Sequence, residues 1–344
     1  MNLFIKNKLF EFIHVETSQK CNLACPMCPR EMLLEKGYLD KSQLSVNNFT
    51  KIFDSIIDNT GKFFLSGNYS DPMMNTDIES IVEYCLSGKQ SHVQIGSNGS
   101  LRKPEVWYNL GKMMRKHYEK HKRWNSVLFA IDGLEDTNPI YRVNSKWWKI
   151  MENAKAFIDG GGFAEWKYIV FEHNEHQVEK AEQLSKEMGF ITFNKILSMR
   201  FVDWFGEVRK DTEVERSTKE DVLKYINHEN DEIHCDAIDK NGIFVTDKGM
   251  VLPCCWVGNE MGYNWQVDKI SKKDYGAKHL KESYPDWEYE LNALEHGINK
   301  VMEHPIWEDL INLWGLGQPL MCYRQCGKKL DDIKHQTIHK NALD

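Results

Sequence analysis

Three cysteines lie within eight residues of one another, in the segment CNLACPMC at residues 21–28. Three thiolates cannot complete the tetrahedral ligand set of a structural zinc site. They can hold three of the four irons of an iron–sulfur cube, which leaves the fourth iron open to another ligand. Cys21, Cys25 and Cys28 are therefore candidate cluster ligands. The alternatives are unrelated thiols or a partial zinc site.

A second set of cysteines lies toward the other end of the chain, at Cys235, Cys254, Cys255, Cys322 and Cys326. Four thiolates would occupy every corner of a second cube. Neighbouring side chains on a strand point to opposite faces, so we expect one member of the Cys254–Cys255 pair to be a ligand and the other to pack in the core. A zinc knuckle with CYRQCG as one half is the alternative.

The composition indicates a folded protein with no general attraction to polyanions. Hydrophobic residues make up 41% and aromatic residues 12% of the 344 residues, enough for a sizeable core. The formal net charge of -7 gives no general attraction to nucleic acid or anionic lipid. The sequence shows no signal peptide, and no run approaches the ~18 apolar residues of a membrane span. We expect a cytoplasmic protein with neither a nucleic-acid nor a membrane partner.

Strand-like and helical segments alternate through residues 1–205. Runs of apolar and β-branched residues predict strands near 10–16, 62–66, 92–97, 127–132, 167–172 and 191–197. Apolar residues at helical spacing predict helices at 47–57, 77–86, 105–120, 147–159 and 175–189. Such a series forms a parallel sheet with right-handed crossovers. It is too short for an eight-stranded barrel, so we expect an α/β fold, a partial (β/α)6 TIM-like barrel with its functional residues at the carboxyl ends of the strands.

The alternation stops after residue 205. The charged residues 206–234 predict a linker with a helix, and residues 235–344 predict a small α+β domain. Within that domain IFVTDKGMVLPCC, residues 243–255, predicts a hairpin around DKG. Residues 256–321 predict an inserted, mainly helical segment, which could line a substrate pocket, cover a cluster or form an extra helical layer.

The cysteine spacing directly after the first strand resembles that of the radical S-adenosylmethionine (radical SAM) superfamily, and the resemblance covers roughly residues 10–205. It implies two cofactors: a 4Fe-4S cluster, and S-adenosyl-L-methionine (SAM) bound to the open iron through its amino and carboxylate groups. One electron from the cluster would then cleave SAM to methionine and a 5′-deoxyadenosyl radical, which abstracts a hydrogen atom from the substrate. A flavodoxin- or ferredoxin-type protein is the implied electron donor.

Three later stretches resemble the SAM contacts of that superfamily. LSGNYSDPMMN (65–75) is similar to its Gly-Gly-Glu-Pro motif, with Ser70 at the second glycine and Asp71 at the glutamate. GSNGSL (96–101) is similar to its Thr-Asn-Gly motif, with serine in place of threonine, and AIDGLEDTNPIYR (130–142) is similar to its DG…YR stretch. The SAM contacts implied by the resemblance are Met27, Gly67, Asn68, Tyr69, Ser70, Asp71, Ser97, Asn98, Asp132 and Arg142.

GMVLPCC (249–255) resembles the hairpin of SPASM and twitch domains, which hold auxiliary iron–sulfur clusters. The resemblance implies an auxiliary 4Fe-4S cluster, and the cysteine count favours the shorter twitch type. Cys254 follows Gly-x-Val-x-Pro, so the implied ligands are Cys235, Cys254, Cys322 and Cys326. The long insertion between Cys254 and Cys322 departs from compact twitch domains.

A fully ligated auxiliary cluster favours electron transfer. We expect a radical SAM oxidoreductase-like enzyme that oxidises a small molecule or a peptide, for example by dehydrogenation. A redox-neutral rearrangement, epimerisation or carbon–carbon coupling is an alternative, and so is a non-catalytic iron–sulfur or zinc protein that binds partners. The sequence identifies neither the substrate nor a catalytic acid or base.

Overall fold

The computed structural model describes residues 9–26, 28–35, 37–197, 233–262, 277–314 and 336–340, and the single positions Cys322 and Cys326. Met27 lies outside the described residues. So do the expected boundary at residue 205 and nearly all of the expected linker at 206–234.

Parallel strands form the centre of the molecule, in the order expected from the sequence. They are β1 (Phe10–Val15), β2 (Thr60–Leu65), β3 (His92–Ser97), β4 (Ser126–Ala130), β5 (Phe163–Val170) and β6 (Thr192–Leu197), each paired in parallel with the next. Ile13, Phe63 and Val127 are fully buried, which is why these strands have apolar runs. The prediction of an open (β/α)6 sheet is confirmed.

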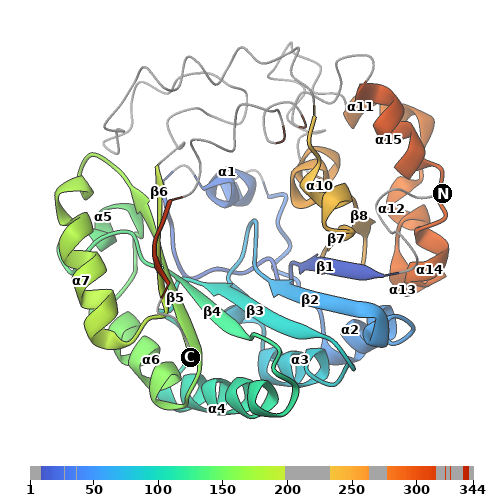
Figure 1. The fold of residues 1–344 in the computed structure, drawn as a ribbon. Coiled ribbons are helices and arrows are strands. Elements are labelled where there is room, and N and C mark those ends of the chain that lie inside the picture. The colour runs from blue at the N-terminus through green and yellow to red at the C-terminus, as the bar shows by residue number, and fades with distance from the viewer. Residues whose placement is uncertain are drawn as a thin grey trace.

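Helices cover the outer face of this sheet in an arc (Figure 1). They are α2 (Val46–Phe53), α3 (Ile78–Cys85), α4 (Pro104–His121), α6 (Trp147–Asp159) and α7 (Val178–Met188). Trp107, Leu110 and Met114 of α4 are buried at helical spacing against the sheet. Gly111 lets α4 approach α6 closely, since a Cβ there would lie 2.3 Å from the carbonyl oxygen of Phe157.

The C-terminal part extends the same sheet. Strand β7 (Gly242–Val245) pairs in parallel with β1, and β8 (Val251–Leu252) pairs antiparallel with β7, so the predicted hairpin is confirmed. At the other edge β9 (Gln336–Lys340) pairs antiparallel with β6. Among the described strands the order is β8-β7-β1-β2-β3-β4-β5-β6-β9, and the sheet is not closed.

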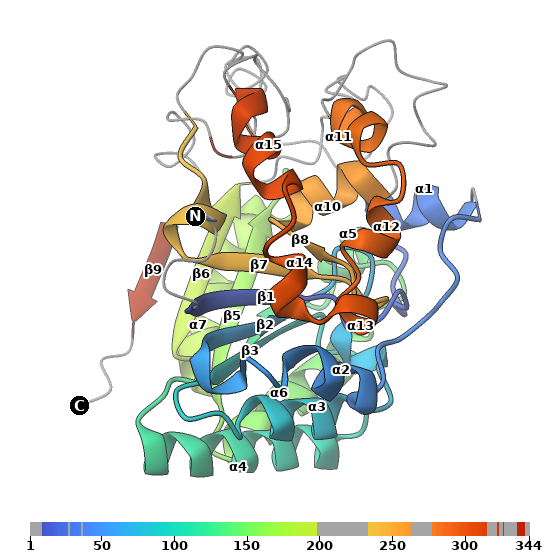
Figure 2. The same ribbon diagram turned by 90° about the vertical axis from the view of Figure 1, so that its right-hand side faces the viewer.

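The described part of residues 256–321 is helical, as expected. Its helices are α10 (Cys255–Gly262), α11 (Ala277–Ser283), α12 (Trp287–Glu290), α13 (Ala293–His296), α14 (Ile298–Val301) and α15 (Ile306–Trp314). They lie at the β7–β8 side of the sheet, away from α4 (Figure 2). No described helix has both the length and the apolar character needed to cross a membrane.

Cys254 and Cys255 do not lie on a strand. Strand β8 ends at Leu252 and α10 begins at Cys255, so Pro253 and Cys254 form the connection between them. We expected the two thiols to point to opposite faces of one strand. That expectation is wrong, because the strand ends before Pro253 and neither cysteine belongs to it.

Candidate functional site

The loops that follow the parallel strands meet at the carboxyl edge of the sheet. Cys21, Cys25 and Cys28 lie in the loop after β1, and Asp71 lies in the loop after β2. Asn98 follows β3, and the segment from Asp132 to Arg142 follows β4. The structure thus brings sequence-predicted residues from separate motifs to one end of the sheet, where α/β folds place their ligands.

The three N-terminal cysteines belong to one small apolar cluster. Cys25 is 7% exposed and packs with Leu23, Tyr141 and Phe171, and the partly buried Cys21 and Cys28 pack against the same group. The backbone N–H of Cys28 donates to the carbonyl oxygen of Cys25 at 3.1 Å, so the loop turns tightly between these two thiols.

Burial keeps two of these thiols protonated when no cation is bound. It raises the pKa of Cys21 to about 12, and the nearby carboxylate of Asp71 adds to this shift. Burial also raises the pKa of Cys25, against the opposing effect of the Arg142 guanidinium. A bound metal reverses this balance, because thiolate ligands are deprotonated by the cation they hold.

Within the described residues no group of three or more Cys, His, Asp or Glu side chains converges on a single-ion site. Ligands of a cube have a different requirement, because each thiolate binds a different iron and the sulfur atoms stay apart. The shared cluster of Cys21, Cys25 and Cys28 matches that donor set.

Asp71 joins the loops after β2 and β3. Its buried carboxylate accepts hydrogen bonds from the Ser97 hydroxyl at 2.9 and 3.0 Å, from the Asn98 N–H at 2.7 Å and from the Met73 N–H at 3.0 Å. Burial raises the pKa of Asp71, and these donors oppose the shift. The Asn98 side chain in turn donates to Asn22 in the cysteine loop at 3.0 Å. Asp71, Ser97 and Asn98 therefore form one connected network beside the cysteines.

Asp132 and Arg142 form a buried ion pair. The Nε atom of Arg142 lies 2.6 Å from Oδ2 of Asp132, whose side chain is fully buried. Asp132 also accepts from the Ile169 N–H at 2.7 Å, which ties the loop after β4 to β5. The Nη1 atom of Arg142 lies 3.9 Å from Sγ of Cys25. The Nε side of the guanidinium therefore binds Asp132, and its Nη1 atom points toward the cysteines.

The loop Gly67–Asp71 makes a tight turn and contacts helix α10 in the C-terminal part of the chain. A Cβ at Gly67 would lie 2.1 Å from the Ser70 hydroxyl and 2.4 Å from its backbone oxygen, so this position requires glycine. Tyr69 is 3% exposed. Asn68 donates through Nδ2 to Oδ1 of Asn259 on α10 at 3.0 Å. The predicted SAM loop thus contacts the C-terminal part directly.

Glu16 is a buried acid that the sequence reasoning missed. It follows β1 directly, and its Oε1 accepts the Tyr69 N–H at 2.8 Å. Burial raises its pKa from 4.5 to about 8, with Asp247 adding to the shift and the Tyr69 N–H opposing it. The available signal was a charged residue that ends an apolar strand just before a cysteine motif.

No family model matches the sequence, and no curated protein matches it. Solved structures do match. The structure of hexahistidine-tagged anSMEcpe with bound AdoMet has a TM-score of 0.60 and 14% identity, covering 94% of this chain and 87% of that one. Native anSMEcpe with bound AdoMet and Cp18Cys peptide has a TM-score of 0.57 and 13% identity, covering 93% and 89%. Both are structures of a radical SAM enzyme.

The chain has the radical SAM fold. Streptococcus suis SuiB also matches, with a TM-score of 0.49 and 13% identity over 82% of this chain, which spans 66% of the SuiB chain.

Unpartnered polar atoms at the carboxyl edge fit a polar ligand in this radical SAM fold. Among the described residues, the Thr17 hydroxyl, Nε of Arg30 and both ring nitrogens of His173 are buried without a hydrogen-bond partner. Such groups cost about 1–3 kcal/mol each when left unsatisfied. All three follow β1 or β5 at the same end of the sheet. A ligand with amino, carboxylate, hydroxyl and adenine groups could form hydrogen bonds with the hydroxyl, the guanidinium nitrogen and the imidazole nitrogens alike.

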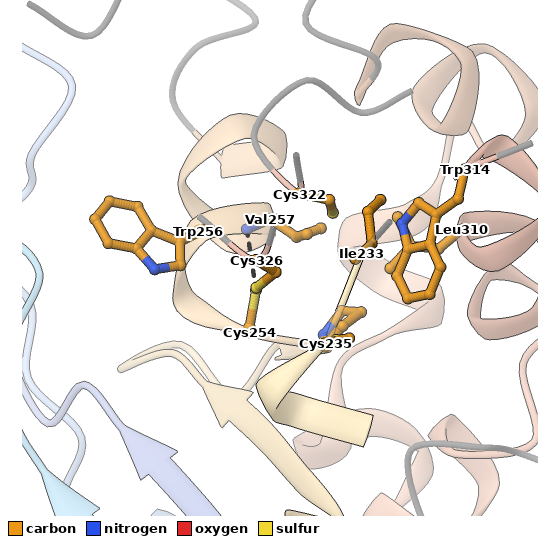
Figure 3. A pocket seen from close by; sticks show the side chains of 10 residues that line it. Ile233, Cys235, Cys254, Trp256, Val257, Leu310, Trp314, Cys322 and Cys326 are labelled. Carbon is orange, nitrogen blue, oxygen red and sulfur yellow. Dashed lines mark hydrogen bonds between the residues drawn. The ribbon is translucent and has the colours of Figure 1, made fainter. Parts of the chain in front are cut away.

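The C-terminal cysteines line a separate cavity (Figure 3). Its walls contain Cys235, Cys254, Cys322 and Cys326, together with Ile233, Pro253, Trp256, Val257, Leu310 and Trp314. The Val257 N–H donates to Sγ of Cys254 at 3.5 Å, and the His234 N–H donates to the carbonyl oxygen of Cys326 at 2.8 Å. Burial raises the pKa of Cys235 to about 11. The four thiols singled out from the sequence therefore come together, and Cys255 does not line this cavity.

Proposed function

We propose that this chain is a radical SAM enzyme that holds a 4Fe-4S cluster on Cys21, Cys25 and Cys28 and binds SAM beside it. The observation that carries the proposal is the gathering of these three thiols, the Asp132–Arg142 pair and the Asp71–Asn98 network at one edge of the parallel sheet. When bound, the reduced cluster and SAM supply a 5′-deoxyadenosyl radical that abstracts a hydrogen atom from the substrate.

The protein's own residues hold and orient the SAM molecule in this proposal. The edge of Arg142 that faces Cys25 suits the SAM carboxylate, since a guanidinium binds carboxylates through paired donors. Asn98 and the backbone of Gly67–Ser70 suit the amino and ribose groups. Asp71 acts through Ser97 and Asn98, because its carboxylate already accepts four contacts from the protein. The buried walls at Tyr141 and Phe171 exclude water.

We further propose that Cys235, Cys254, Cys322 and Cys326 hold an auxiliary 4Fe-4S cluster. The cavity that they line supports this assignment. Four thiolates leave no open iron, so the group would transfer an electron, which favours oxidation of a small molecule or a peptide. The peptide in the complex of native anSMEcpe is the reason to begin a substrate screen with peptides. A flavodoxin- or ferredoxin-type donor and a cytoplasmic location belong to the same proposal.

The test is SAM cleavage by the anaerobically reconstituted, reduced protein. We expect 5′-deoxyadenosine, measured by chromatography and mass spectrometry. We expect none from a variant with Cys21, Cys25 and Cys28 changed to Ala. Cys85→Ala is the matched control, because Cys85 is a buried core thiol outside both sets. Equal product from the triple variant and the control would refute the proposal.

A further inference from the structure

The tip of the β7–β8 hairpin reaches the loop that carries the barrel cysteines. Asp247 at this tip is 6% exposed, although it lies in a turn. Its carboxylate accepts the Gln19 side-chain N–H at 3.3 Å and also accepts the Ser42 hydroxyl. Beside it, Lys248 forms a surface ion pair with Asp40 at 2.6 Å.

The cysteine loop comprises residues 20–41, and Gln19 and Ser42 are the residues that flank it on either side. The Gln19 N–H donates to the carbonyl oxygen of Ser42 at 3.0 Å, and the Leu44 N–H donates to that of Thr17 at 2.9 Å. The Gln19 side-chain oxygen also accepts the Asp40 N–H at 3.1 Å. The chain from Lys20 to Lys41, with all three cysteines, is thus closed at its base by two backbone hydrogen bonds that flank one antiparallel β-bridge between Ser18 and Gln43.

Asp247 contacts both sides of this closure and is itself held firmly. Val245, two residues earlier, pairs with Val15 in the sheet, and its carbonyl oxygen accepts the Glu16 N–H at 2.9 Å. Gly249 has a φ of +85°, which shapes the turn that presents Asp247. The position of the carboxylate is therefore fixed by β1, the strand from which the cysteine loop starts.

We propose that Asp247 is a positioning residue, which closes the barrel cysteine loop from the C-terminal hairpin and so sets the geometry of the SAM site. The proposal rests on the proposed radical SAM function for its activity readout. An apolar side chain at 247 would leave the buried Gln19 amide and the Ser42 hydroxyl without this acceptor. The hydrogen bonds at the base of the loop would then break more often, and the positions of the three cysteine thiols would be less well defined.

The first measurement needs no cofactor. Metal-free protein is treated with iodoacetamide, and alkylation of Cys21, Cys25 and Cys28 is followed by mass spectrometry. We expect Asp247→Leu to speed alkylation about tenfold, as loss of roughly one buried hydrogen bond implies. Asp247→Asn keeps an acceptor for Gln19 and a partner for Ser42, so it should stay within about twofold of the wild type. Cys85 is the internal reference for global opening. Lys89→Met is the control, because it breaks an exposed ion pair with Asp58 outside this loop.

The second measurement uses the reconstituted enzyme. Asp247→Leu should raise the SAM concentration for half-maximal 5′-deoxyadenosine formation by about tenfold, and it should alter the electron paramagnetic resonance spectrum of the reduced barrel cluster with SAM. Asp247→Asn should restore both. If Asp247→Leu does not fold, Ser42→Ala replaces it, with the same direction expected and a smaller change.

Unchanged alkylation of the three thiols in a folded Asp247→Leu or Ser42→Ala variant would overturn the inference. Faster alkylation of Cys85 to the same degree would also overturn it, because the effect would then be global. If the wild type cleaves no SAM, the proposed function fails, while the alkylation result still decides the role of Asp247.

Discussion

Arg142 and Asp132 share a buried ion pair with an N–O distance of 2.6 Å, and the same guanidinium lies 3.9 Å from Sγ of Cys25. One cation thus connects a carboxylate after β4 with a thiol after β1. The Arg142 side chain is 16% exposed and that of Asp132 is not exposed at all. The pair therefore does two things: it anchors the loop after β4 to β5 through Ile169, and it presents a positive edge to the cysteines.

Removal of Arg142 should be costly because it leaves a charge without its partner. We expect Arg142→Met to lower the free energy of unfolding by about 3–5 kcal/mol, the usual penalty for breaking a buried pair from one side. Asp132→Asn in the same chain should recover part of this loss. Denaturant unfolding of the metal-free single and double variants measures both effects. As the control, Lys155→Met breaks an exposed pair with Asp159 and should change the free energy of unfolding by less than about 1 kcal/mol. Additive single effects in the cycle would contradict a direct Arg142–Asp132 interaction.

Metal analysis should separate the two cysteine sets. The Cys21/Cys25/Cys28→Ala variant should retain about four irons after reconstitution, the content of one cube at the C-terminal cavity. A variant with Cys235, Cys254, Cys322 and Cys326 changed to Ala should also retain about four irons, now in the barrel site. Elemental analysis and visible spectra measure both. Zinc without iron in the first variant would favour the knuckle alternative and remove the electron-transfer role.

Glu16 should make the stability of the protein depend on pH. Its pKa rises from 4.5 to about 8 on folding, with burial as the largest cause. Between these values the folded state keeps the proton and the unfolded state has lost it, so stability falls as pH rises. The fall should be about 1.4 kcal/mol per pH unit across that window.

Glu16→Gln removes this titration while it retains an acceptor for the Tyr69 N–H. Denaturant unfolding of the metal-free proteins at pH 5, 6, 7 and 8 measures this. At each step upward in pH, the free energy of unfolding of the variant should rise relative to that of the wild type. Parallel curves for the two proteins would contradict a buried, protonated Glu16.

The strands and helices of the barrel were predictable because each one carries its own signal. Trp107, Leu110 and Met114 repeat at helical spacing, and each strand carries buried apolar residues such as those of β3, which alternate with less buried ones. The cysteine sets were predictable for a similar reason, since residue type and spacing are local. The pairing of β7 with β1 was not predictable, because it joins segments more than 200 residues apart whose apolar patterns would suit many partners.

The roles of individual polar residues depend on tertiary contacts in the same way. Asp71 was expected to contact SAM, and the structure shows its carboxylate accepting hydrogen bonds from Ser97, Asn98 and Met73. The contacts of Glu16 and Asp247 were not predictable from their sequence positions, because both side chains are buried against loops distant in the sequence. Sequence alone indicates which cysteines gather in each set, and it leaves open the residues that hold the surrounding loops in place.

Cys254 and Cys255 provide the sharpest test of the C-terminal site. Cys254 lines the cavity with three other cysteines. Cys255 does not, and burial, followed by the nearby Glu16 carboxylate, raises its pKa to about 12. Cys254→Ala should therefore lose the auxiliary cluster, or make it labile, and still bind SAM at the barrel cluster. It should make some 5′-deoxyadenosine and little oxidised product.

Cys255→Ala is the matched control at the neighbouring position. It should keep both clusters and lose mainly packing energy, about 1 kcal/mol of stability. Iron counts and the ratio of oxidised product to 5′-deoxyadenosine measure the difference, and the reverse pattern would move the ligand role to Cys255.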